Sequence, residues 1–520
     1  MKYKIFNYIA VFFSLALVTT SCVQDEDLLQ VDPNVETAGS FWKTDQDAIE
    51  GVNAAYSSLL TDGTYMRSTP LLLDARADDS RTNSPWASMY NVGHFNSNVA
   101  DAAIYGWAYE TYYQGIYRAN QVLANVPAIE FQDAALKNRI LGQAHFLRGL
   151  YLFHAVNMFK SVPVPTDVSV KYPQKSEAEG WAQVIADFKD AAELLPTSYD
   201  NISGLDKGEK GRATKGAALG YLGKAYLFTK DFANAKATFR QVIDLGVYSL
   251  VANYRDNFTT ANENNSESLF EVQMSREAGD VDLGWGGIPA SGWGKTSARA
   301  ITYAPRAFGW TDVQPSWALF NEFHDEKTTA GDLDPRLDAT IFYNKPGGMK
   351  LYGKDFATFY AASPADLNDI FCRKYQNSDG EFSDEYDWRS GINERLLRYA
   401  DILLMYAETL NETGDTPGAY TYIQMVRNRV GLPDLATAKP GMSQDQMREQ
   451  LGHERFLEFP LEGHRFDDIR RWGWLQNGAK LAWLKSRDAE FNSYTPGREY
   501  YPIPQLEMDN NPGTIQNDSY

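Results

Sequence analysis

The chain has 520 residues, of which 43% are hydrophobic, and a formal net charge of −19. The apolar content is ample for a sizeable core, and by length alone the chain could hold two or three domains. The negative charge opposes binding to a polyanion and no basic patch offsets it, so we expect no nucleic-acid partner.

The N-terminal segment has the pattern of a secretory signal. A short basic start precedes an apolar run from Ile5 to Val18, which is too short to span a bilayer. Cys22 directly follows this region and resembles a bacterial lipoprotein cleavage site, at which the cysteine is acylated. The alternative is an ordinary signal peptide with an incidental cysteine. A polar tether follows, and we expect the first helix to begin near Asp45.

A polar, turn-forming stretch with a tryptophan comes next. It reads DDSRTNSPW and ends at Trp86, with Tyr90 just beyond. The turn formers predict a surface loop, which would expose the indole ring beside carboxylate, guanidinium and amide groups. A sugar presents an apolar C–H face and a rim of hydroxyls, so this combination favours sugar binding.

Helical periodicity dominates the following part of the chain. The segment from Gly142 to Pro165 predicts a long buried helix that is stopped by prolines. Between Leu222 and Phe239, small and aromatic residues fall at the spacing of a tetratricopeptide repeat, in which small residues allow close helix approach and aromatic rings fill the gap. These segments predict neighbouring helices with facing apolar stripes.

A second aromatic segment, residues 283–294, holds two tryptophans flanked by glycines and has no helical or strand period. Such rings suit exposed platforms. The candidate ligand-binding residues of the two segments are Trp86, Trp285, Trp293, Asp78, Arg81, Asn83 and Tyr90. Because a tryptophan belongs to a core more often than to a ligand site, we assign the following to packing: Trp107, Trp310, Trp472, Trp474 and Trp483.

Another pair of helices is predicted near the C-terminus. Apolar residues recur at helical spacing from Leu403 to Leu410 and again from Ala419 to Val426, with a break at Gly414. Because repeat-like segments lie on both sides of an irregular middle, we predict a mainly α fold. It would be a tetratricopeptide-like helical-repeat scaffold with a large irregular, loop-rich insertion.

Signs of chemistry are few. Glu454, Glu458 and Glu462 recur at four-residue spacing among arginines, which favours an ion-pair network over catalysis. A glycosidase pair drawn from distant acids stays open. The six histidines form no convincing metal pair, and nucleotide-binding and nucleophile motifs are missing from the sequence. We therefore expect no catalytic residue, metal or cofactor, and we expect Cys372 to be a packed thiol.

The stretch from Arg398 to Trp472, which includes RYADILLMYAETLNETGD and ERFLEFPLEGHRFDDIRRW, resembles the C-terminal signature of the SusD/RagB family. FWKTDQDAIEGVNAAYSSL near the N-terminus and the segment from Gly142 also resemble this family. The resemblance implies a SusD-like fold. The expected organisation is a signal peptide at 1–21, an acylated tether at 22–40 and a single domain at 41–520, with the scaffold at about 41–246 and 394–475 and the ligand-binding insertion at about 247–393.

The resemblance also implies a function. Members are outer-membrane lipoproteins, here anchored through Cys22 and facing the cell exterior, that bind an oligosaccharide ligand without chemistry. They deliver it to a SusC-like TonB-dependent transporter. Three alternatives stay open: uptake of a peptide or glycoprotein by the same fold, a surface glycoside hydrolase, and a structural scaffold without a ligand.

Overall fold

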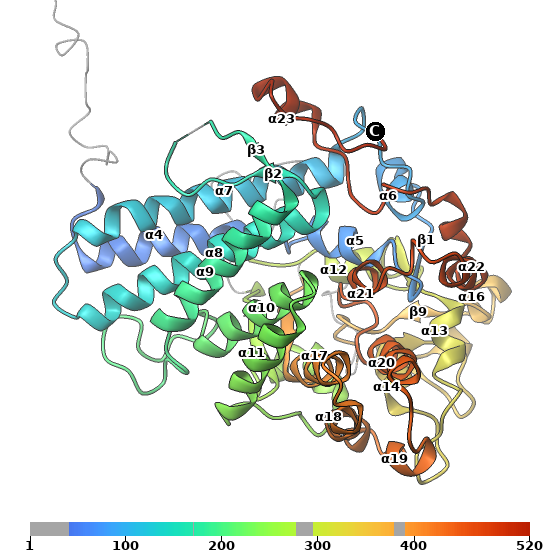
Figure 1. Cartoon of the computed structure of the whole chain (residues 1–520). Coiled ribbons are helices and arrows are strands. Elements are labelled where there is room, and N and C mark those ends of the chain that lie inside the picture. The colour runs from blue at the N-terminus through green and yellow to red at the C-terminus, as the bar shows by residue number, and fades with distance from the viewer. Residues whose placement is uncertain (1–40, 170, 277–294, 379–389) are drawn as a thin grey trace, which may run out of the picture.

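The computed structural model describes residues 41–169, 171–276, 295–378 and 390–520. Eight helices of the described chain pack in antiparallel pairs of sequence neighbours, and each pair contacts the next. The blue and cyan helices lie at one end of the molecule, and the orange helices lie toward the other (Figure 1). The eight helices are α4 (Asp45–Ser57), α7 (Ala103–Asn125), α8 (Ala134–Phe159), α9 (Glu177–Leu194), α10 (Lys215–Phe228), α11 (Phe232–Asp244), α17 (Tyr399–Glu412) and α18 (Thr416–Arg429).

The predicted helix after Gly142 is confirmed as α8, which is buried along nearly all of its length between α7 and α9. It ends at Phe159, and the prolines that follow cannot continue it. Helix α4 begins at Asp45, as predicted, because the Thr44 side chain accepts a hydrogen bond from the Asp47 backbone N–H in a capping box.

The two predicted helical hairpins are confirmed as α10–α11 and α17–α18, and α11 packs on α17 between them. The break at Gly414 has a φ of +88°, a backbone conformation that glycine adopts readily, and Asp415 caps the following helix. The fold is thus mainly α, as the sequence predicts.

Strands are short and pair two by two in antiparallel ladders. The pair β4–β10 joins a strand within the predicted insertion to the strand at which the scaffold resumes. The ladders are β1 (Ser80–Thr82) with β5 (Val313–Pro315), β4 (Ser268–Val272) with β10 (Glu394–Arg398), β2 (Val162–Pro163) with β3 (Gln174–Lys175), β6 (Ile341–Phe342) with β9 (Phe371–Cys372), and β7 (Lys350–Leu351) with β8 (Lys354–Asp355).

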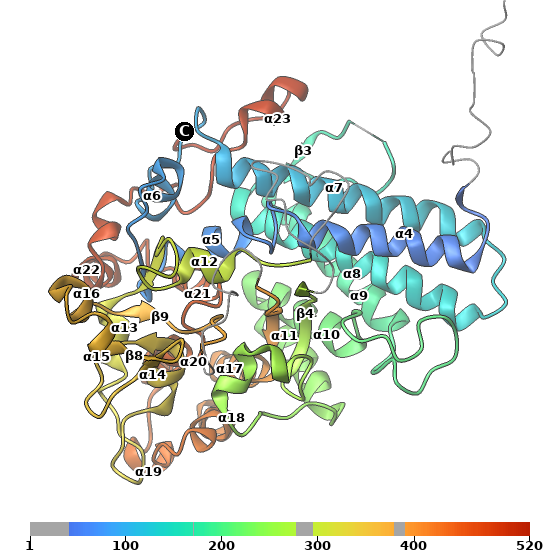
Figure 2. The same cartoon turned by 180° about the vertical axis from the view of Figure 1, so that it is seen from behind.

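Most of the remaining helices are shorter, and several cover the end of the molecule that lies away from α4 and α7 (Figure 2). They are α5 (Ser68–Asp74), α6 (Ala87–Gly93), α12 (Arg299–Tyr303), α13 (Trp317–Glu322), α14 (Pro335–Thr340), α15 (Phe356–Phe359), α16 (Pro364–Leu367), α19 (Leu435–Ala438), α20 (Gln444–Glu458), α21 (Arg465–Arg471), α22 (Gly478–Arg487) and α23 (Gln505–Asn510). In the described part of the chain, every helix is too short or too polar to cross a bilayer.

The glutamates of the C-terminal block lie in buried ion pairs, as predicted. Glu458 contacts Arg336 at 3.1 Å and Arg398 at 3.1 Å, and Glu462 contacts Arg398 at 2.8 Å. Burial would raise the pKa of Glu462, but Arg398 and Lys374 outweigh it and lower this pKa to about 2. These carboxylates are structural and have no access to solvent.

Candidate functional site

The tight turn at residues 61–67 places an arginine beneath the start of α7. Gly63 permits the approach, because a Cβ at this position would lie 2.2 Å from the carbonyl oxygen of Trp107. Arg67 is only 2% exposed, and its Nε and Nη2 donate to the two carboxylate oxygens of Asp62 at 2.6 Å each. This bidentate pair fixes the plane of the guanidinium group.

Two tryptophan rings lie over that guanidinium. Trp86 and Trp107 stack with their ring centroids 6.0 Å apart and an interplanar angle of 29°. The Arg67 Cζ atom lies 5.3 Å from the Trp86 ring and 5.6 Å from the Trp107 ring, within cation–π range. Both rings are half-buried and keep part of their surface in solvent. We call this pair the Trp86–Trp107 platform.

Trp107 differs from the prediction, which assigned it to packing alone. It lies on α7 next to the buried Ala108, but its ring pairs with Trp86 and reaches solvent. Sequence reasoning missed this because the two tryptophans come from different elements, and no helical or strand period links them.

The candidate loop presents further exposed groups beside the platform. Asn83 is exposed, and its backbone N–H donates to the carbonyl of Asp312 at 3.3 Å, which continues the β1–β5 ladder. Tyr90 follows Trp86 by one helical turn, is 44% exposed, and stacks on His94 with centroids 3.8 Å apart. The structure therefore brings Asn83, Trp86 and Tyr90 together at the surface of one short segment.

Arg81 is less available to a ligand than Asn83, Trp86 and Tyr90. It forms an ion pair with Asp369, which comes from the loop before β9, and 31% of its side chain remains exposed. A ligand at this position would therefore meet a guanidinium group that already has a carboxylate partner.

The expectation for Asp78 is corrected. Asp78 is fully buried, and its carboxylate accepts from Arg465 Nε at 2.6 Å and from Arg487 Nε at 2.8 Å. Burial would raise the pKa of Asp78, but the two arginines outweigh it and the pKa is lowered. Its turn-forming neighbours suggested a surface loop, whereas β1 pairs with β5 and carries this end of the loop into the interior.

The second predicted segment holds Trp285 and Trp293, which lie outside the described residues. Its described flanks can be placed. Ser275 and Lys295 form a β-bridge, and the backbone N–H of Ala298 donates to the carbonyl of Met66 at 2.8 Å. One flank of this segment therefore adjoins the turn that holds Arg67.

We predicted that several other tryptophans pack in a core, and the structure confirms this for some of them and not for others. Trp474 is buried, as predicted, whereas Trp483 is 38% exposed although its ring packs edge-on against Trp474 at 5.6 Å. Trp310 is 37% exposed, so burial in a core is the wrong description for it. It lies two residues before Asp312, whose carbonyl pairs with Asn83.

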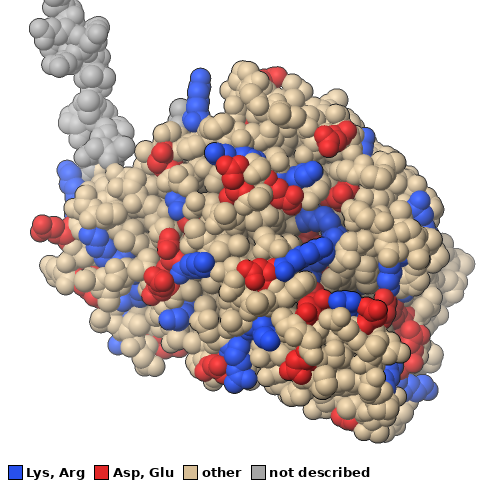
Figure 3. Space-filling view, in the orientation of Figure 1, with Lys and Arg blue, Asp and Glu red and all other residues tan. Residues whose placement is uncertain are grey.

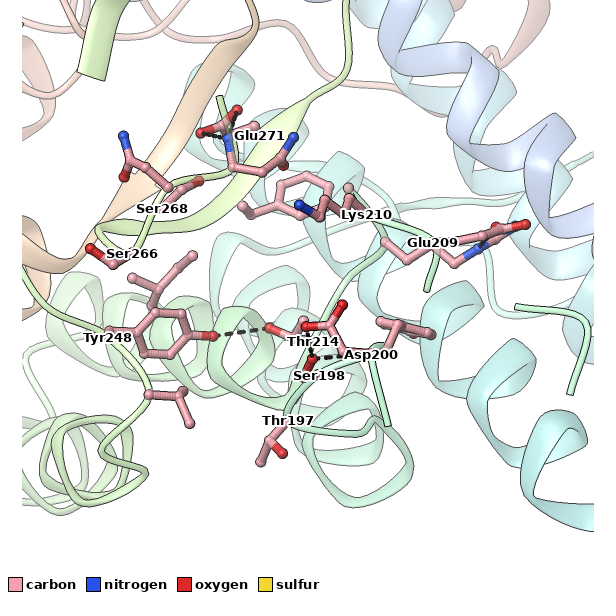
Figure 4. A pocket seen from close by; sticks show the side chains of 18 residues that line it. Thr197, Ser198, Asp200, Glu209, Lys210, Thr214, Tyr248, Ser266, Ser268 and Glu271 are labelled. Carbon is pink, nitrogen blue, oxygen red and sulfur yellow. Dashed lines mark hydrogen bonds and ion pairs between the residues drawn. The ribbon is translucent and has the colours of Figure 1, made fainter. Parts of the chain in front are cut away.

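A cavity of about 540 Å³ lies between the loop that joins α9 to α10 and the strand β4 (Figure 4). Its walls are rich in hydroxyl, amide and carboxylate groups. Tyr248 and Thr214 are hydrogen-bonded through their hydroxyls at 3.1 Å, and Ser198 donates to Asp200 at 2.9 Å. These four polar groups are thus engaged with one another.

A second cavity of about 510 Å³ adjoins the first, since Glu209, Lys210, Gly211 and Arg212 line both. It extends past Gln273 toward α4 and Lys295. On the face seen in Figure 3, basic and acidic side chains are interspersed.

Groups with potential for chemistry occur elsewhere, with structural partners. His145 and His154 contact different elements, as predicted: His145 Nδ1 lies 2.9 Å from Asp187 Oδ1, and His154 Nε2 contacts the Tyr65 hydroxyl. His145 and Asp187 group with Asp190, but Arg148 already donates to Asp187 at 2.6 Å and supplies a cation there.

Cys372 is buried, as predicted for a packed thiol, and burial raises its pKa to about 12. A thiol in this state is unreactive, because the thiolate is the nucleophilic form.

Known proteins match both halves of the chain. A family model described as the SusD family matches residues 266–520, and one described as starch-binding associating with outer membrane matches residues 43–227. A SusD-like protein of Formosa agariphila is 26% identical, covering 96% of each chain. A SusD superfamily protein from Bacteroides vulgatus has a TM-score of 0.78 and 26% identity, and a laminarin-binding SusD-like protein has a TM-score of 0.73 and 26% identity. Both structures cover 92% of this chain, and the match covers 100% of theirs.

Proposed function

Because the chain belongs to the SusD/RagB family, we propose that it is an outer-membrane lipoprotein that binds glycans at the cell surface and delivers them to a SusC-like TonB-dependent transporter. The observation that carries the proposal is the Trp86–Trp107 platform, in which two partly exposed indole rings are held over a fixed guanidinium group. The binding of laminarin by a structural relative supports a glycan as the ligand class.

The chemistry of the platform suits a saccharide. An indole face stacks on the apolar C–H face of a pyranose ring, and the hydroxyl rim needs hydrogen-bonding groups at the edge. Asn83 and Tyr90 offer an amide and a phenol beside Trp86, and both are exposed. Trp285 and Trp293 remain proposed contributors from the second segment.

The test is affinity electrophoresis of the purified chain in gels that contain plant, host or microbial polysaccharides. We expect at least one glycan to retard the unmodified protein, and we expect Trp86→Ala to abolish that retardation. Trp483→Ala is the matched control, because Trp483 is also a partly exposed tryptophan but packs on Trp474 in a different hydrophobic cluster. Trp285→Ala tests the second segment in the same gels.

Three outcomes would argue against this site. Equal loss of retardation in the Trp86 and Trp483 variants would indicate a general effect on the fold. Retardation that survives Trp86→Ala would place the ligand elsewhere, and lack of retardation by every glycan would favour a peptide or glycoprotein cargo.

We propose binding without chemistry. The glutamates that recur in the C-terminal block are buried in ion pairs, so they are not available as a general acid and nucleophile. The check is release of reducing ends from each retarding glycan by purified protein; sustained turnover would establish a hydrolase instead.

The proposed location depends on Cys22. Acyl chains on this cysteine would hold the protein on the outer membrane facing outward, where the helical scaffold could pack on the transporter. Cell fractionation tests the anchor, since the Cys22→Ala protein should be lost from the membrane fraction. Copurification tests the partner, since the unmodified protein should copurify with a TonB-dependent transporter. A Cys22→Ala protein that stays with the membrane would contradict acyl anchoring.

A further inference from the structure

The cavity of about 510 Å³ beside α4 differs in charge from the rest of the chain. Two lysines, Lys210 and Lys295, line it together with Asn53, Tyr56 and Gln273. We call this site the lysine cleft. It is separate from the Trp86–Trp107 platform, whose residues do not line it.

The backbone places the two lysines on either side of the chain that follows β4. Gly211 has a φ of +84°, and a Cβ there would lie 2.3 Å from Gln273 Cγ, so only glycine lets the Lys210 loop approach this closely. On the other side, the Ser275 backbone N–H donates to the Lys295 carbonyl at 2.6 Å. The backbone near both lysines therefore lies against the chain that follows β4.

The carboxylates of the cleft already have cationic partners. Glu209 forms an ion pair with Arg212, and Glu271 lies 3.2 Å from Arg395 Nε. Lys210 and Lys295 are exposed and have no carboxylate within ion-pair distance among the described residues. Three basic and two acidic side chains line the cleft, which gives it a net charge of +1 in a chain whose net charge is −19.

We propose that the lysine cleft binds the carboxylate or sulfate groups of an acidic saccharide. Two ammonium groups around a cavity of this size give charge-assisted hydrogen bonds to an anion, which are stronger than bonds between neutral groups. The exposed Asn53 amide can serve the hydroxyls of the same sugar. That the anion belongs to a saccharide rests on the proposed function.

A short segment of chain connects the cleft to the turn beneath the platform. Lys295 lines the cleft, and Ala298 hydrogen-bonds to Met66, the residue before Arg67. Three peptide steps span at most about 11 Å between Cα atoms. The cleft and the turn that holds Arg67 are therefore linked through this segment.

The test compares glycans that differ only in charge. Isothermal titration of the full chain would use oligogalacturonate and its methyl ester, and dextran sulfate and dextran, so that one pair tests carboxylate and the other sulfate. The test variant is Lys210→Gln/Lys295→Gln. The control is Lys189→Gln/Lys207→Gln, which removes the same charge from exposed positions outside the cleft.

We expect tighter binding of at least one acidic polymer than of its uncharged counterpart. The Lys210→Gln/Lys295→Gln variant should weaken that binding by about tenfold, and the control should change it less than about twofold. Equal affinity for charged and uncharged polymers, or equal effects of the two double variants, would overturn the proposal. Binding of a neutral glycan that depends on Trp86 would still support the proposed function, so the two failures are distinguishable.

Discussion

Glu394 is a buried carboxyl group, and only one of its two oxygens has a partner among the described residues. Its Oε2 lies 3.2 Å from Arg299 Nη1, whereas its Oε1 has no hydrogen-bond partner among the described residues. Burial raises the pKa of Glu394 to about 7, although Arg299 acts in the opposite direction. Between its ordinary value of 4.5 and pH 7, the folded chain therefore holds a proton that the unfolded chain has released.

This difference predicts a pH dependence of stability. Since the folded state binds more protons in that window, the unfolding free energy falls as pH rises from 4.5 to 7 and levels off above pH 7. Glu394→Gln removes this contribution. The unfolding free energy of the variant, relative to that of the unmodified chain, should therefore rise by up to about 3 kcal/mol from pH 5 to pH 8. Urea unfolding of both proteins at the two pH values measures the gain.

The exposed Glu193→Gln on α9 serves as the control for loss of one carboxyl group. A difference between Glu394→Gln and the unmodified chain that stays constant from pH 5 to pH 8 would contradict the prediction.

The candidate site was predictable only in part at the residue scale. Polar turn formers before Trp86 correctly indicated an exposed Asn83, but the same pattern failed for Asp78, which two distant arginines hold in the interior. Burial of a charged residue depends on partners brought by tertiary contacts, and local composition does not encode them. The role of Trp107 was missed for the same reason.

Close packing of α10 on α11 depends on a glycine. A Cβ at Gly223 would lie 2.5 Å from the Phe239 ring, closer than real Cβ contacts allow. This is the small-and-aromatic pairing that the repeat spacing predicted, with the ring of one helix filling the space left by the other.

Gly223→Ala should therefore destabilise the protein although alanine is the better helix former. The methyl group forces the two helices apart or moves the ring, at a cost of about 1–3 kcal/mol, which exceeds the gain of roughly 1 kcal/mol in helix propensity. Gly478→Ala, in α22 with open space around its Cβ position, is the matched control and should be neutral or stabilising. Chemical denaturation measures both, and equal stability of the two variants would refute the argument.

Helices were the predictable elements, because apolar periodicity and breakers such as Gly414 mark them along the chain. The ladders were not, since strands of two to five residues carry little pattern. β1 pairs with β5, which is distant in the sequence, so its register is set by tertiary structure.

At the scale of the whole molecule, Arg398 links segments that are far apart in the sequence. It precedes α17, is 1% exposed, and contacts Glu267 before β4 as well as Glu458 and Glu462 of the C-terminal block. Arg429 also contacts Glu267 and Glu458, so two arginines join the start of β4 to the C-terminal block.

Removing this arginine should destabilise the entire fold, because it leaves three buried carboxylates without their shared partner. We expect Arg398→Met to lower the unfolding free energy by about 3–5 kcal/mol at neutral pH. Arg240→Met, which removes a solvent-exposed pair with Asp244, should have no measurable effect. The deficit of Arg398→Met should shrink as pH falls from 7 to 4. Glu462 loses one of the two cations, Arg398 and Lys374, that lower its pKa to about 2, so a proton can neutralise it at a higher pH than in the unmodified chain. A deficit that is small at pH 7, or that does not change with pH, would show that Glu267, Glu458 and Glu462 do not depend on Arg398.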